Sequence, residues 1–152
     1  MTKEILLSLK GLQLTSDDEG QELETITAAD YYRKNGSHYV LYDEVTEGFD
    51  EVTKNMIKFR EDCLEVTKRG LINVHMVFEE NKKNMTSYVT PYGNILVGID
   101  TGSVLVEEEE KQIKIQVAYT LEANYQYLAD CRIEMMIRPK EEGLNRWFAS
   151  SH

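Results

Sequence analysis

The chain has 152 residues, a length that suits a single domain of about 100–200 residues. Its 17 Lys and Arg against 27 Asp and Glu give a net charge of −10, which argues against binding to nucleic acid or to an anionic membrane surface. Hydrophobic residues at 41% and charged residues at 29% are typical of a globular domain and exclude a disordered chain.

The start of the chain and the cysteine content favour a cytoplasmic protein. The apolar patch at residues 5–9 is too short for a signal peptide, and no run is long enough for a membrane-spanning helix. Cys63 and Cys131 are too few for a disulfide framework and fit a reducing compartment. We therefore expect a cytoplasmic location.

Alternating apolar and polar residues predict β-strands along most of the chain. Ile5, Leu7 and Leu9 share one parity, whereas Leu12 and Leu14 have the other. We expect a β-bulge at Gly11, between them, that returns the apolar face to the core. Residues 23–33 and 51–68 stay ambiguous, because their apolar positions fit a helix as well as a strand. Further alternating runs lie at residues 72–79, 112–121 and 131–138.

Turn signals separate these runs, among them Lys34-Asn-Gly-Ser37 and Arg69-Gly70. Their spacing suits an antiparallel meander, since parallel strands need longer crossovers. Such a high strand content is normally reached only by a barrel or a sandwich. The acidic run Glu107-Glu-Glu-Glu110 is typical of a solvated hairpin tip, because consecutive carboxylates diverge and do not converge on a cation.

Several short motifs follow one another along the chain, namely Tyr42-Asp-Glu44, Lys68-Arg-Gly70, Met76-Val-Phe78, Tyr88-Val-Thr-Pro-Tyr-Gly93, Ile99-Asp-Thr101 and Tyr119-Thr-Leu121. In their order and spacing these motifs resemble the YwiB-like family of bacterial proteins, and the resemblance covers roughly residues 3–138. That family is a domain of unknown function, so the resemblance supplies no active site. It implies a calycin-like antiparallel β-barrel. It also implies that the ambiguous segments are strands.

We predict one all-β domain at residues 1–140, a closed or nearly closed antiparallel barrel of about eight to ten strands that is lipocalin-like. Residues 141–152 are predicted to form a tail or a short helix. Leu144, Trp147 and Phe148 share one helical face there, at i, i+3, i+4 spacing. A helix this short needs something to pack against.

The candidate ligand-binding residues are Arg69, Phe78, Tyr88 and Tyr119. The two tyrosines and Phe78 fall on the apolar wall, and a tyrosine combines a large apolar surface with one hydroxyl, as in many small-molecule sites. The same alternation builds any packed core, which is the favoured interpretation. Arg69, at a strand end, could hold an anionic group over the barrel mouth, although an ion pair with an acidic residue is favoured.

Metal binding and nucleophilic catalysis find no support in the pattern. His38, His75 and His152 lack metal-ligand spacing, and we predict no metal, no cofactor and no catalytic residue. Cys63 and Cys131 fall on opposite faces of the predicted sheet, which argues against a disulfide between them. The pattern therefore favours a protein that is not an enzyme.

Our leading hypothesis is a cytoplasmic barrel that binds a small apolar or amphipathic ligand in its interior. The alternative is a structural or protein-interaction module with no small-molecule ligand. It would form a homodimer or dock a partner through its outer face or through the tail that carries Trp147. Neither hypothesis involves nucleic acid or a membrane.

Overall fold

The structure is a computed structural model that describes residues 3–11 and 24–140, and its elements are ten antiparallel β-strands. The strands are β1 (Lys3–Lys10), β2 (Glu24–Lys34), β3 (Ser37–Val45), β4 (Val52–Arg60), β5 (Cys63–Arg69), β6 (Val74–Glu79), β7 (Lys82–Thr90), β8 (Gly93–Glu108), β9 (Ile113–Ala123) and β10 (Gln126–Pro139). In the part of the chain that the structure describes, no helix is long and apolar enough to cross a membrane.

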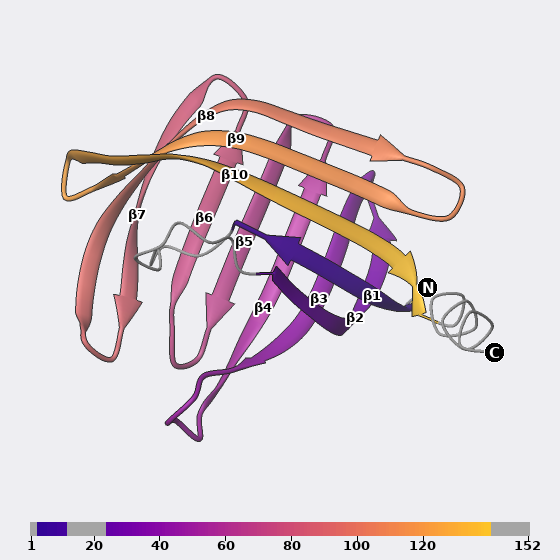
Figure 1. Ribbon diagram of the computed structural model, residues 1–152, viewed down its shortest axis with the longest axis horizontal. Coiled ribbons are helices and arrows are strands. Elements are labelled where there is room, and N and C mark those ends of the chain that lie inside the picture. The colour runs from indigo at the N-terminus through magenta and orange to yellow at the C-terminus, as the bar shows by residue number, and fades with distance from the viewer. Residues whose placement is uncertain (1–2, 12–23, 141–152) are drawn as a thin grey trace.

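The strands form one sheet that curls into a nearly closed barrel (Figure 1). All chain neighbours except β6 and β7 pair with each other, and β1 pairs with β10, so β6 and β7 are the two edges of the sheet. At this seam Asn73 and Val89 exchange backbone hydrogen bonds of 2.9 and 3.0 Å. The side-chain amide of Asn84 also donates to the Val77 carbonyl at 3.2 Å. The prediction of an antiparallel barrel with eight to ten strands is confirmed.

The ambiguous segments are strands, namely β2, β4 and β5. Asn35 and Gly36 connect β2 to β3 with φ values of 52° and 80°, the two positive angles of a type I′ hairpin turn. Strand β4 lies between β3 and β5, so its backbone groups are paired on both sides. This pairing decides between helix and strand where the local pattern fits both.

Side chains fill the centre of the barrel. A group of inward-facing residues from six strands has 0% exposure, so no water-sized space touches them. Phe59, Met76 and Phe78 extend this core at 1% exposure each. The fully covered apolar residues are Leu7, Val40, Ile57, Val66, Ile115, Val117 and Ile133.

Strand β8 has an irregular middle that carries its second half across one end of the barrel. Its register with β9 shifts between Thr101 and Ser103, as at a β-bulge, and its pairing with β7 ends at Thr101. Strands β8, β9 and β10 cross over the strands behind them at a large angle (Figure 1). Glu108, at the end of β8, thereby reaches Arg33 of β2 and His38 of β3, to which β8 is not paired.

Some predictions concern residues near or beyond the described segments. Gly11 follows β1 with φ 81°, but Leu12 and Leu14, which the expected bulge would have returned to the core, lie outside the described residues. The predicted tail or short helix at residues 141–152 also lies outside them. Both cysteines are free, and Cys63 is buried although it has the outward parity.

Candidate functional site

Two of the four predicted ligand-binding residues meet in the packed core. The rings of Phe78 and Tyr119 touch edge to face, with centroids 4.9 Å apart at 70°. Both side chains are buried, and burial raises the pKa of the Tyr119 hydroxyl well above its usual range. The Tyr119 hydroxyl donates a long hydrogen bond of 3.4 Å to the Gly11 carbonyl. These contacts are those of a core pair whose polar atom has a backbone partner.

No hydrogen bond, ion pair or ring contact links Arg69 or Tyr88 to that pair or to each other, although Tyr88 also packs against the core. Strand alternation directs Arg69 to solvent and its neighbour Lys68 into the barrel. Tyr88 is half-buried on β7, and burial together with the negative charge of Glu44 raises its pKa. The structure therefore does not bring the four predicted residues together in one site.

A buried polar cluster closes the end of the barrel near Tyr88, and we call Glu44, Asn55 and Lys68 the Lys68 cluster. The Lys68 Nζ atom donates to Glu44 Oε1 at 2.9 Å and to Asn55 Oδ1 at 2.8 Å. The Asn55 amide donates to the same Glu44 oxygen at 3.2 Å. Each member of the cluster therefore has hydrogen-bond partners within it, which compensates the polar groups for their loss of water.

A second cluster, built around His38 at the other end of the barrel, has features of a functional site. The His38 ring stacks on Phe59 with centroids 4.4 Å apart, and its side chain is only 7% exposed. The Tyr31 hydroxyl lies 2.7 Å from His38 Nδ1, and Glu108 Oε1 lies 2.9 Å from His38 Nε2. Arg33 forms an ion pair with Glu108. We call Tyr31, Arg33, His38 and Glu108 the His38 cluster.

The charges in the His38 cluster follow from burial and from the Arg33–Glu108 pair. Burial lowers the pKa of His38, and the nearby Arg33 charge lowers it further, against the opposite effect of Glu108. The hydrogen bond from Arg33 lowers the pKa of Glu108. A neutral His38 with its proton on Nε2 donates to Glu108 and accepts from the Tyr31 hydroxyl. In this arrangement the Tyr31 hydroxyl and the Glu108 carboxylate fix the orientation of the His38 ring.

The His38 cluster borders a cleft of about 530 Å³ at the barrel end. This volume falls within the range of about 300–1,000 Å³ that is usual for small-molecule sites. The cleft offers donors, acceptors and one apolar side chain, so it can bind a ligand with both polar and apolar parts. It is lined by Arg33, Gly36, His38, Arg60, Glu61, Asp62, Val106 and Glu108. Residues 3–11 and 24–140 contain no group of three or more His, Cys, Asp or Glu that could hold a metal ion.

Sequence reasoning missed the His38 cluster. The run Glu107-Glu-Glu-Glu110 is exposed at the end of the β8–β9 hairpin, as predicted, but that interpretation did not include the contacts of Glu108 with Arg33 and His38. A signal was present for part of the cluster, because the two-residue turn at Asn35-Gly36 sets Arg33 directly opposite His38. No local signal places Glu108 beside them, since β2 and β8 are far apart in the sheet order.

Comparisons with known proteins agree with the fold. The family described as "Domain of unknown function (DUF1934)" matches residues 7–135. The chain is also similar to the crystal structure of the YwiB protein from Bacillus subtilis, with a TM-score of 0.71 and 20% identity over 90% of each chain. No curated protein matches the chain. At this identity the structural similarity shows the fold alone.

Proposed function

Because the chain belongs to the DUF1934 family of domains of unknown function, we propose a function from the barrel itself, namely that it binds a small amphipathic ligand at the His38 end. The supporting observation is the contrast between the packed centre and the cleft at this end. Residues such as Val40 and Ile57 leave no water-sized space in the middle of the barrel. The interior, where we expected the ligand from the sequence, has no room for it. We therefore place the ligand at the mouth of the barrel, with its apolar part directed inward.

Arg60 and Val106 give this cleft its amphipathic character. Val106 is half-buried and packs against the core, which provides an apolar contact for the ligand. Arg60 contacts Asp62 through a single 3.4 Å bond, and both side chains are more than half exposed. Such an exposed ion pair contributes little, so the Arg60 guanidinium is available to an acceptor group of a ligand.

Native mass spectrometry of freshly purified protein tests for a co-purified ligand. Anilinonaphthalene sulfonate, which has an apolar ring system and an anionic group, serves as the probe for affinity. We expect Arg60→Gln to weaken probe binding about tenfold, the loss of one charge-assisted contact. Arg69→Gln is the matched control, because Arg69 is exposed at the opposite end of the barrel. Equal affinity of the two variants, or no bound ligand and no probe binding, would refute the proposal.

A protein-interaction module is the second candidate, and one observation favours it. The hairpin between β9 and β10 exposes Tyr125, Tyr127 and Leu128 at 75%, 65% and 54%. Exposed apolar side chains grouped in this way are typical of contact surfaces. The same native mass spectra report the oligomeric state. A dimer that Tyr127→Ser weakens would support this candidate, and a monomer at high concentration would contradict it.

We also infer that the protein works in a reducing compartment such as the cytoplasm. Cys63 and Cys131 are supporting observations, because neither forms a disulfide. Burial raises the pKa of both thiols, which slows their oxidation. Recovery of the protein with secreted or periplasmic fractions would contradict this inference.

A further inference from the structure

A groove crosses the outer face of the barrel over four neighbouring strands, β2, β1, β10 and β9, and has a volume of about 390 Å³. Its middle row runs from Ile26 through Ser8 and Met136 to Lys114, which are partners in successive ladders. Because Ser8 is much smaller than the residues on either side, the row is hollow at its centre. Leu6 adds to the apolar floor, and Ile26 is 66% exposed.

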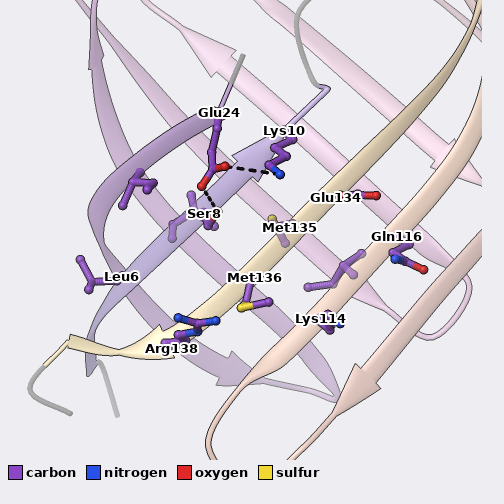
Figure 2. Close-up of a pocket in the computed structure, with 13 residues that line it drawn as sticks. Leu6, Ser8, Lys10, Glu24, Lys114, Gln116, Glu134, Met135, Met136 and Arg138 are labelled. Atoms are coloured by element: carbon purple, nitrogen blue, oxygen red, sulfur yellow. Dashed lines mark hydrogen bonds and ion pairs between the residues drawn. The ribbon is translucent and has the colours of Figure 1, made fainter. Parts of the chain in front are cut away.

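Charged side chains flank this apolar floor. Figure 2 shows Arg138 and Lys114 on one side of the groove, and the Lys10–Glu24 pair together with Glu134 on the other. Lys10 and Glu24 form an ion pair of 3.4 Å. Arg138 and Lys114 have no ion-pair partner among residues 3–11 and 24–140. The groove therefore has an apolar floor and a cationic side that is open to an anionic group.

We propose that residues 141–152 of the same chain fold back onto the barrel and occupy this groove. Strand β10 ends at Pro139, one residue after Arg138, so the segment begins beside the groove. Its sequence starts with Glu141 and Glu142, which complement the cationic side. Burial of its apolar residues against the floor covers surface that is otherwise exposed to water.

The length of the segment fits this path. Extended chain spans about 3.3–3.6 Å per residue, so the five residues from Lys140 to Leu144 reach up to roughly 17 Å. Met136 and Ile26 lie two strands apart, a separation of roughly 10 Å. Leu144, Trp147 and Phe148 share one face at i, i+3, i+4 spacing, which matches a floor of this width.

Trp147 is the only tryptophan of the chain, so its fluorescence reports on the segment alone. In the full-length protein we expect blue-shifted emission and weak quenching by acrylamide. Met136→Glu removes an apolar contact and places a carboxylate against the segment. We expect it to lower the ratio of docked to free segment by at least about tenfold, with emission shifted to longer wavelength.

Met85→Glu is the matched control, because it makes the same substitution at an exposed position of β7, away from the groove. Ile26→Glu provides a second groove variant. Its side chain is exposed, so the change leaves the packed core intact, and circular dichroism checks folding in each case. Unchanged Trp147 emission in both groove variants would overturn the proposal. Shielding that disappears on dilution would also overturn it, because it would assign the groove to the segment of a second copy.

Discussion

Replacing Glu44 by Gln tests whether the Lys68 cluster depends on charge compensation. The substitution keeps the size of the side chain and removes the negative charge beside Lys68 Nζ, which lies 2.9 Å from Glu44 Oε1. The Lys68 side chain is 8% exposed, so its ammonium group would keep neutral amide oxygens as hydrogen-bond acceptors but would lose the carboxylate that compensates its charge. Stability should therefore fall.

The size of this loss follows from burial. Removing one partner of a fully buried ion pair costs about 3–5 kcal/mol. Glu44 is 38% exposed, so water reaches part of the site and reduces the cost to about 2 kcal/mol. For a domain of this length that corresponds to a melting temperature lower by roughly 4–8 °C. Lys68→Met should cost less, about 1 kcal/mol, because Glu44 can be solvated and the replacement is apolar.

Urea unfolding followed by circular dichroism measures these differences. Asp43→Asn is the matched control, since Asp43 precedes Glu44 on β3 and pairs with Lys54 through side chains that are 61% and 77% exposed. We expect this control to change stability by less than about 0.5 kcal/mol. If Glu44→Gln loses no more stability than Asp43→Asn, compensation of the Lys68 charge does not stabilise the barrel.

Three further predictions concern the His38 cluster, the core pair and one turn. The pKa of His38 is lower in the folded protein, so the unfolded chain binds a proton on this residue more readily. The stability that neutral His38 provides above pH about 6.5 is therefore lost as the pH falls. His38→Gln should flatten this part of the pH–stability curve. Phe78→Ala should cost about 3–5 kcal/mol in urea unfolding and Tyr119→Phe less than about 1 kcal/mol; similar losses would contradict the core assignment. Gly70→Ala should cost about 2 kcal/mol or more, because its Cβ would lie 2.2 Å from the Val52 carbonyl oxygen at φ 143°; a variant with a wild-type melting temperature would show that the turn can adjust.

The direction of side chains could be predicted wherever a strand alternates regularly. On β5 the inward positions Leu64 and Val66 continue to Lys68, so the alternation directs Lys68 inward and Arg69 outward. The prediction nevertheless chose Arg69, because a guanidinium at a strand end could hold an anionic group over the barrel mouth. The sequence contained the signal for Lys68, but the partners of a buried lysine come from other strands.

The seam and the β8 irregularity could not be predicted in the same way. Asn84 donates its side-chain amide to the Val77 carbonyl where β6 and β7 separate, and no local pattern marks this replacement for a ladder bond. The shift between Thr101 and Ser103 depends on how β8 leaves β7 and follows β9. Both features arise from closure of the barrel, which imposes a strand tilt and stagger on the whole sheet.

The sequence by itself determined the class of fold, because a period of two in the apolar residues and a two-residue Asn35-Gly36 turn are local properties of an antiparallel sheet. It also determined which faces are buried, since a strand cannot shift by one residue without exposing its apolar side chains. Only the tertiary structure decided which polar residues meet. Glu108 is 70 residues from His38 in the chain, and the two come together because the second half of β8 crosses the barrel end. Contacts of this kind depend on how all ten strands close into the barrel, and this closure is not encoded in any single segment of the sequence.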